Sequence, residues 1–498
     1  MDPRRHLRSI GIVAGYVLVS VAICMALGWL AARITAVRLL DDANQRLARV
    51  EAGQPLWQWR LRKPHDVIAG RAFGHATLAR DDDALSITSQ DGTVFELGLP
   101  VDDALDLAHW PILQVQVQSS AAGTLELLWG SGLTPSCEAS KASVLAPNVR
   151  TLRVDLRGLS WRSINGSSCS SPGAARMLRL RVQIPANASL RLTSIALLTT
   201  EPTAHAQNII IDLSGNTLES AGARADGQAM PWFRLPDGLG AEAMLTARDQ
   251  LRARWPGALI LPAATQPQAS SPNAHTAIAW AACVLYLVLL VWLARRPIIG
   301  PLRPWLEIAG CLLGPMWLVA GLHWGQNPTA LGLLAFGGGL AYALFIERRH
   351  LPRLWRWPAS GRDWLWPLAT LPLTLALILV YGHALHPLQL AHALTYFAWA
   401  WLQQWLMLVV LLRRIEQIDH HRPAPSIVAI ALLFALLHTP NGMLMQLCFV
   451  AELWWAWCFL RSRSVLPIAL AHAACALLVE SGLVGGLLRS LEVSARFF

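Results

Sequence analysis

Residues 427–441 read IVAIALLFALLHTPN, and residues 464–478 read SVLPIALAHAACALL. Each is an apolar run with a single histidine, His438 in the first and His472 in the second. A third apolar run, residues 391–412, carries the adjacent amides Gln403 and Gln404. Polar and ionisable groups at membrane depth are costly and usually face a protein interior or a cavity. We therefore expect three consecutive membrane helices, each with a polar group of possible functional use.

The composition indicates that much of the chain lies in lipid. Of the 498 residues 54% are hydrophobic and only 14% are charged, and the mean hydropathy is +0.40. An ordinary soluble protein does not have this composition. The formal net charge of +10 could suit a nucleic acid, but many arginines lie in short loops beside apolar runs, where positive charge sets topology. We expect a lipid bilayer as partner and no nucleic acid.

Windows of about 20 apolar residues predict an α-helical polytopic membrane bundle of about nine spans. The predicted spans are 9–31, 276–294, 304–323, 328–346, 364–382, 391–412, 425–439, 441–460 and 464–488. The seventh window is short, because Pro425 and Pro440 bound it. We therefore expect His438 near the end of a helix.

The positions of the arginines predict the orientation of these spans. Arginine clusters precede the first span and follow the second, fourth, sixth and eighth, whereas the alternate short loops hold no Lys or Arg. Positive loops stay in the cytoplasm, so we expect a multi-pass protein of a bacterial inner membrane. Its N-terminus would be cytoplasmic, and the segment 33–274 and the C-terminus periplasmic. Residues 1–32 could also be a cleaved signal peptide, but an apolar run of about 22 residues favours an N-terminal membrane anchor.

The exported segment has a different pattern, in which apolar and polar residues alternate. Such runs occur at 112–118, 124–128, 151–156, 177–184 and 189–195, and they predict strands with one buried and one wet face. We expect an inserted all-β sandwich, jelly-roll-like, within residues 33–200. Carbohydrate-binding modules share such sandwiches, so Trp110, Trp129 and Trp161 could stack on sugar rings. The alternative, which the sequence favours, is that they are core and rim residues of a scaffold.

The cysteines fit the same division of the chain. Of eight cysteines only Cys137 and Cys169 lie in the exported segment outside predicted spans. Two cysteines in an oxidising compartment predict one disulfide. Residues 201–274 are expected to be a periplasmic linker with a short helix at about 241–255.

The polar residues of the last spans resemble the motifs of the CAAX-protease and bacteriocin-processing (CPBP, or Abi-type) intramembrane proteases. The family has a Glu-Glu pair followed by Arg, then Phe-x-x-x-His, then His-x-x-x-Asn. Phe434 and His438 match the second motif, and the run that leads to His472 resembles the approach to the third. The resemblance implies protease-like helices at 391–488, preceded by further membrane helices at 275–390.

Four positions depart from the family pattern. Gln403-Gln404 stands in place of the Glu pair, Leu408 in place of Arg, and Ala476 in place of Asn. In the family a Glu activates the attacking water while His and Asn residues assist. A glutamine amide cannot take up that proton, although it can orient a water or donate to an oxyanion. Either the peptidase is impaired or another base has taken over.

Glu452 is the candidate replacement because it lies in an apolar span at a similar depth. Gln403, Glu452 and His472 lie nine or ten residues from an arginine at a helix end, which is roughly 13–15 Å along a helix. We expect Gln403, His438, Glu452 and His472 to line one cavity. Two His and one Glu could also bind zinc, but the chain has no HExxH motif. We expect no metal and no cofactor.

Two functions remain open at this point. The first is an intramembrane endopeptidase that acts on a membrane or exported protein, with candidate catalytic residues His438, His472, Gln403, Gln404 and Glu452. The second is an inactive binding or scaffold protein that links the sandwich to an envelope protein or a polysaccharide partner. Further polar residues near predicted span ends are expected to lie at the membrane interface; these are Glu307, His323, His383, His386 and His392.

Overall fold

The structure is a computed structural model of the full chain. The residues it describes are 3–101, 104–132, 136–139, 143–164, 169, 173–199, 210–214, 222, 224–225, 227–268, 275–296, 300–320, 329–348, 356–418 and 422–498. The chain divides into two compact units. The helical unit comprises Met1–Ala36, Leu239–Leu245 and Asn273–Phe498, and the sandwich unit comprises Val37–Gly238 and Thr246–Pro272.

The first helix, α1 (Pro3–Glu51), contributes residues to both units. The sequence predicts an anchor that ends near residue 32, but the helix continues for about five further turns. Leu39, Ala43 and Val50 recur at helical spacing in this extension and are buried, as in an amphipathic helix. Ala43 and Val50 belong to the core of the sandwich unit.

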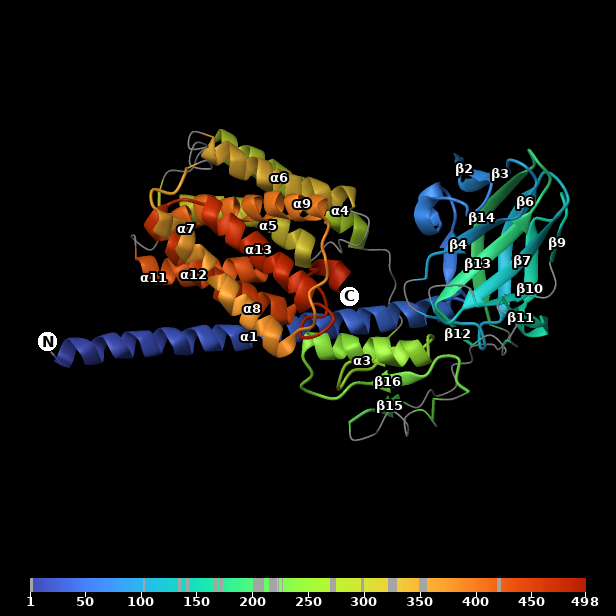
Figure 1. Ribbon diagram of the computed structural model, residues 1–498, viewed down its shortest axis with the longest axis horizontal. Coiled ribbons are helices and arrows are strands. Elements are labelled where there is room, and N and C mark those ends of the chain that lie inside the picture. The colour runs from blue at the N-terminus through green and yellow to red at the C-terminus, as the bar shows by residue number, and fades with distance from the viewer. Residues whose placement is uncertain are drawn as a thin grey trace. The chain divides into compact units, whose positions relative to one another are not determined.

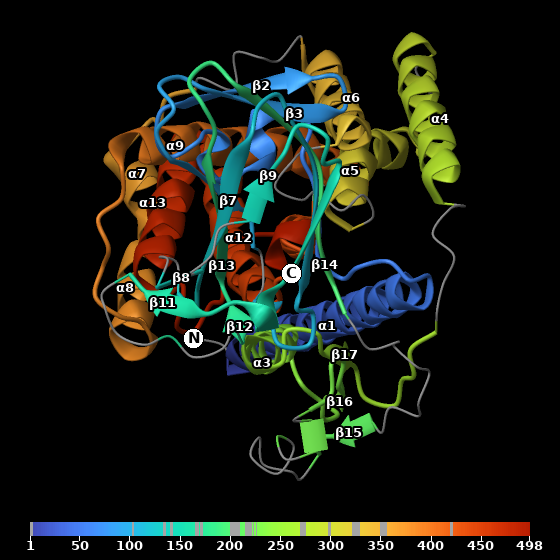
Figure 2. The same cartoon turned by 90° about the vertical axis from the view of Figure 1, so that its right-hand side faces the viewer.

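Two antiparallel sheets form the sandwich unit (Figures 1 and 2). One has the strand order β10-β6-β14-β3-β2 with β1 beside β14, and the other has the order β11-β8-β7-β13-β4 with β9 beside β7. A short pair, β5 with β12, lies apart from them. The strands are β1 Gln58–Arg60, β2 Ala76–Asp81, β3 Ala84–Ser89, β4 Phe95–Leu99, β5 Leu105–Asp106, β6 Ile112–Ser119, β7 Gly123–Gly130, β8 Cys137–Ala139, β9 Ser143–Leu145, β10 Thr151–Asp155, β11 Trp161–Ser163, β12 Ala174–Ala175, β13 Met177–Gln183 and β14 Ser189–Leu198.

One core lies between the two sheets. Leu113, Val115 and Val117 alternate along β6 with more exposed glutamines, and all three are buried in the same apolar cluster as Leu180 and Val182 of β13. This period of two is the pattern of a strand with one buried face. The separate all-β domain predicted from the sequence is thus present.

The tryptophans and cysteines of the sandwich serve its packing. Trp110 is 2% exposed and Trp129 is 6% exposed, so neither presents a ring face to a ligand. Trp161 packs edge-on against Trp129, with 6.2 Å between ring centroids. The sulfur atoms of Cys137 and Cys169 form a disulfide, with their Cα atoms 6.1 Å apart.

Residues 201–274 hold more structure than the predicted linker with one short helix. β15 (Ile210–Asp212), β16 (Trp232–Arg234) and β17 (Leu259–Leu261) form a parallel sheet. α3 (Ala241–Arg254) provides the crossover between β16 and β17, which parallel strands require. Three-residue strands are too short to show a period in the sequence, so only the helix could be predicted.

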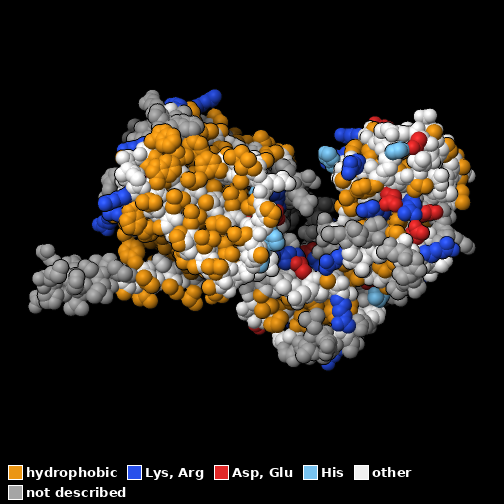
Figure 3. Space-filling view, viewed as in Figure 1, with side chains coloured by type: hydrophobic (Ala, Val, Ile, Leu, Met, Phe, Trp, Pro, Cys, Tyr) orange, Lys and Arg blue, Asp and Glu red, His pale blue; other side chains and the backbone are white. Residues whose placement is uncertain are grey.

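The described residues include six helices that are long and apolar enough to cross a membrane, and one of them is α1, which continues into the sandwich unit. Two shorter apolar helices coincide with the predicted seventh and ninth spans, so the number of spans stays a prediction. Apolar side chains cover the face of the helical unit shown in Figure 3, and Leu379 for example is 86% exposed. The helices after α3 are α4 His275–Arg295, α5 Arg303–Ala320, α6 Ala330–Glu347, α7 Gly361–Leu368, α8 Thr370–Tyr381, α9 Leu390–Gln404, α10 Leu412–Ile418, α11 Pro423–Leu436, α12 Gly442–Ser462 and α13 Leu466–Gly482.

A π-helical segment, Trp405–Leu411, joins α9 to α10. The three form one continuous helix, Leu390–Ile418. Helix α9 packs against α13, and α11 packs against α12. π-Helical turns are rare and are often found at functional sites. This one begins directly after Gln404.

Candidate functional site

His472 lies in the middle of α13 and is surrounded by aromatic rings. The ring centroid of Trp455 on α12 is 5.2 Å away, that of Phe434 on α11 is 5.5 Å away, and that of Tyr396 on α9 is 6.5 Å away. His472 is 5% exposed. Rings from three helices therefore hold the imidazole in a fixed orientation.

Gln404 connects His472 to Glu452. Its Nε2 donates to Oε2 of Glu452 at 2.9 Å and lies 3.4 Å from Nδ1 of His472. Gln404 and Glu452 are fully buried. The Gln404 amide therefore links the carboxyl group of Glu452 to the imidazole of His472.

His438 follows the end of α11, in the turn that leads to α12. Its Nδ1 lies 2.9 Å from the carbonyl oxygen of Phe434, and its ring packs 4.8 Å from the Phe434 ring. The motif spacing of four residues thus places the histidine over the last helical turn. Asn441 then caps α12, because its side-chain oxygen accepts from the backbone N–H of Leu444.

The two histidines present different ring nitrogens when both are neutral. Nδ1 of His438 donates to a carbonyl oxygen, so its Nε2 is an acceptor. Nδ1 of His472 accepts from the Gln404 amide, so its Nε2 carries the proton and is a donor. One imidazole can therefore receive a proton while the other donates a hydrogen bond.

A cavity of about 2150 Å³ opens beside these groups within the helical unit. Its wall includes Gln403, His438 and His472, and most of the remaining lining is apolar. Glu452 does not line it, in contrast to the expectation that all four predicted residues would do so; it is fully buried and bonded to Gln404. Ala476, at the position of the family's Asn, also lines the cavity.

Three buried polar atoms at this site have no hydrogen-bond partner among the described residues. They are Oε1 of Gln404, Oε1 of Glu452 and Nε1 of Trp455. Nearly all buried polar groups in proteins are paired with protein atoms or with ordered water. Two acceptors and a donor that remain free beside a histidine are suited to bind a small polar species such as water.

Glu307 lies in the second turn of α5, where it is 9% exposed and its carboxylate accepts from Nε of Arg414 at 2.8 Å. Its place at the membrane interface stays a prediction. His392 bonds to Glu480 at 2.9 Å beside the cavity, and His383 bonds to the Val484 carbonyl at 2.7 Å. His323 lies outside the described residues. Side chains that pair across so many positions leave no pattern in the local sequence from which the contact could be predicted.

Among the described residues, no group of three His, Cys, Asp or Glu side chains is arranged to hold a metal ion. The polar cluster instead has the composition of an acid–base site. It combines a carboxylate, an amide and two imidazoles, and all of them lie between residues 403 and 472.

Residues 387–478 match the Rce1-like type II CAAX prenyl endopeptidase family. The match spans the segment from just before α9 to most of α13, and it contains every residue of the site. The resemblance predicted from the motifs is confirmed for this segment, which is less than a fifth of the chain. The segment is therefore similar to this family. No curated protein matches the chain.

Several solved structures are similar to part of the chain. One is a family 11 carbohydrate-binding module from Clostridium thermocellum in complex with a mixed-linked tetrasaccharide, with 10% identity, a TM-score of 0.21 and coverage of 26% of this chain and 86% of that one. Another is a mutant of a family 29 carbohydrate-binding module, with 7% identity, a TM-score of 0.19 and coverage of 28% and 89%. Similarity at this level assigns no ligand to the chain.

Proposed function

We propose that the helical unit is an intramembrane peptidase in which Glu452 has taken over the role of the missing glutamate. The observation that supports this most is the 2.9 Å hydrogen bond from Gln404 to Glu452. It brings a carboxylate from α12 beside the position at which the family carries its own carboxylate. Neighbouring His472 completes the set of groups that peptide hydrolysis needs.

In the proposed reaction, Glu452 takes a proton from water while the water oxygen bonds to the carbonyl carbon of the substrate peptide. The carbonyl oxygen becomes an oxyanion, which the Nε2–H of His472 stabilises. The carbon–nitrogen bond then breaks, and the proton held by Glu452 passes to the departing nitrogen. Gln404 orients the water and holds Glu452, since its amide cannot itself act as a base.

The proposed setting is a bacterial inner membrane, with the sandwich unit in the periplasm. The distribution of arginines between alternate short loops supports this orientation. An apolar cavity beside a polar cluster suits a membrane or exported protein whose apolar segment must leave lipid to be cleaved.

The competing function is a binding protein without catalysis. The glutamine pair is the feature in its favour. The burial of Trp110 and Trp129 removes two of the three aromatic residues that were candidates to hold a sugar, so a polysaccharide partner would need other residues of the sandwich.

The test compares membrane protein termini by mass spectrometry. Cells that lack the chain are complemented with the wild type, with Glu452→Gln or with Glu416→Gln, a control that removes another buried carboxylate of the same segment. New termini should appear with the wild type and the control and be absent with Glu452→Gln. If Glu452→Gln yields the same termini, Glu452 is not the base. If no terminus depends on the chain although its loss has a phenotype, the binding function holds.

A further inference from the structure

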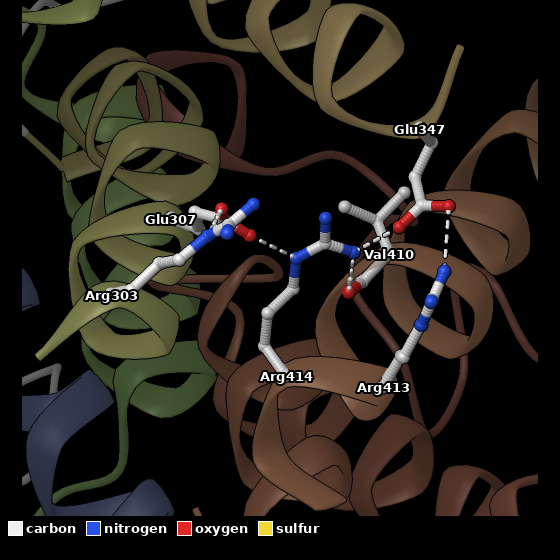
Figure 4. Close-up of polar contacts among 6 residues, drawn as sticks. All are labelled: Arg303, Glu307, Glu347, Val410, Arg413 and Arg414. Carbon is white, nitrogen blue, oxygen red and sulfur yellow. Dashed lines mark hydrogen bonds and ion pairs between the residues drawn. The ribbon is translucent and has the colours of Figure 1, made fainter. Parts of the chain in front are cut away.

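A cluster of charges with a buried centre at Arg414 lies on the helical unit, ten residues beyond Gln404 (Figure 4). Arg414 of α10 donates to Glu307 of α5 through Nε at 2.8 Å and to Glu347 of α6 through Nη1. Arg303 binds Glu307 at 2.8 Å, and Arg413 lies 3.4 Å from Glu347. We call these five residues the α5–α6–α10 charge cluster.

The cluster holds helices that are far apart in sequence. Glu347 is 1% exposed and Arg414 is 5% exposed, so solvent competes little for their contacts. Glu307 and Glu347 lie outside the segment that matches the protease family, whereas Arg414 lies inside it. Two arginines of the protease-like segment, Arg413 and Arg414, thus pair with carboxylates on the helices that precede it, and Arg414 is the one that contacts both α5 and α6.

Arg414 also binds the π-helical segment. Its Nη1 donates to the carbonyl oxygen of Val410 at 2.7 Å, within the segment that separates α9 from α10. Each residue inserted into an α-helix changes the direction of the side chains beyond it by about 100°. The rotation of the helix decides which of two adjacent glutamines meets Glu452. In the structure Gln404 is buried against Glu452, and Gln403 faces the cavity.

We propose that Arg414 is a positioning residue that, by binding Glu307 and Glu347, fixes the rotation of the α9–α10 helix so that Gln404 and not Gln403 meets Glu452. The rotation of the helix can be measured without any catalytic activity. Its consequence for catalysis rests on the proposed peptidase function. Because the helix is continuous from Leu390 to Ile418, a rotation fixed at Arg414 is transmitted to Gln404, about 15 Å away.

Thiol labelling of the purified full chain in detergent measures this rotation without any substrate. The six free cysteines are replaced by alanine, and Gln403→Cys or Gln404→Cys is introduced singly and reacted with a small maleimide. With the cluster intact, the first variant should be labelled quickly and the second should be protected. In the combined variant Glu307→Gln, Glu347→Gln, Arg414→Gln, the ratio of the two rates should fall towards equality. This variant leaves no unpaired charge buried among the three and should therefore fold.

Two further variants make the result decisive. Arg414→Lys, made with Glu307 and Glu347 intact, keeps the positive charge. It should therefore retain most of the protection of a cysteine at position 404. Arg463→Gln removes an ion pair with Glu416 on the same helix α10, at 2.7 Å, that involves neither α5 nor α6, and should leave the ratio unchanged. An unchanged ratio in the combined variant, or an equal fall in Arg463→Gln, would overturn the proposal. Failure of the peptidase function would appear separately, as cleavage that does not depend on Glu452.

Discussion

Gln404 is one of the residues at which this chain departs from the protease motif, and it is the one that contacts Glu452. A glutamate here would carry the base itself. A glutamine instead donates a hydrogen bond to Glu452 across the helix interface. The position at which the family motif has a carboxylate holds an amide here, and the carboxyl group of Glu452 lies within hydrogen-bond distance of it.

The buried amide should stabilise the fold as well as the site. Gln404→Leu removes the donor to Glu452 and leaves a buried carboxylate without it, which costs about 1–3 kcal/mol. Gln403→Leu, at the adjacent amide that faces the cavity, should cost much less. Denaturant unfolding of the purified protein in detergent measures both. Equal losses would show that the Gln404–Glu452 bond contributes nothing specific.

Asp91 gives the sandwich unit a pH-dependent turn. The hydroxyl of Thr93, the His75 ring and the backbone N–H of Thr93 all bond to its carboxylate and lower the pKa of Asp91 to about 2. A carboxylate with a lowered pKa contributes its stability above about pH 4 and loses it as the pH falls through about 2. The free energy of unfolding of the sandwich unit should therefore fall as the pH drops from about 4 to about 2, and denaturant titration at each pH measures it. Asp91→Asn should show a smaller fall over this range, and equal falls in the two proteins would contradict the assignment.

At the level of single residues, the sequence predicted which side chains belong to the site but not which side chains they contact. It singled out His438, Glu452 and His472 because polar groups are conspicuous in apolar helices. It could not decide between Gln403 and Gln404, because adjacent residues differ by about 100° and the π-helical segment has no signature in the sequence. Glu307 and Arg414 are 107 positions apart, so their pairing could not be predicted from the sequence either.

At the scale of elements, the strong periodicities were predictable and the short elements were not. β6, β13 and α3 follow from alternation or helical composition. The parallel sheet β15-β16-β17 has three-residue strands, and contacts between distant segments define it. The continuation of α1 beyond residue 32 was missed because charged residues interrupt its apolar run, although its buried face persists.

The disulfide joins β8 to the segment after β11 and should stabilise the sandwich unit. Cys137 and Cys169 are 32 positions apart, and closing a loop of this size removes chain entropy worth about 3–4 kcal/mol from the unfolded state. Cys137→Ser with Cys169→Ser should lower the free energy of unfolding of the sandwich by that order. Denaturant titration followed by tryptophan fluorescence measures the change, with Cys24→Ser as the control. No difference between the variants would show that the bond does not constrain the unfolded chain.

At the scale of the whole molecule, the orientation in the membrane stays a prediction from the arginines. A reporter fused after residue 200 or at the C-terminus should be active only outside the cytoplasm, and one fused after residue 355 only inside. Replacing the arginines that follow the second and fourth predicted spans should weaken this preference. A cytoplasmic signal at residue 200 would contradict the periplasmic placement of the sandwich unit.

In the proposed peptidase the catalytic carboxylate lies on α12 in place of α9, and exchanging the two side chains tests this placement. Glu452→Gln alone should abolish chain-dependent cleavage, as read by mass spectrometry of membrane protein termini. The double variant Gln404→Glu, Glu452→Gln keeps the same two side chains in contact and returns the carboxylate to α9. We predict that it restores the wild-type termini. If the double variant is as inactive as Glu452→Gln, or if Glu452→Gln retains the cleavage, Glu452 has not replaced the missing base.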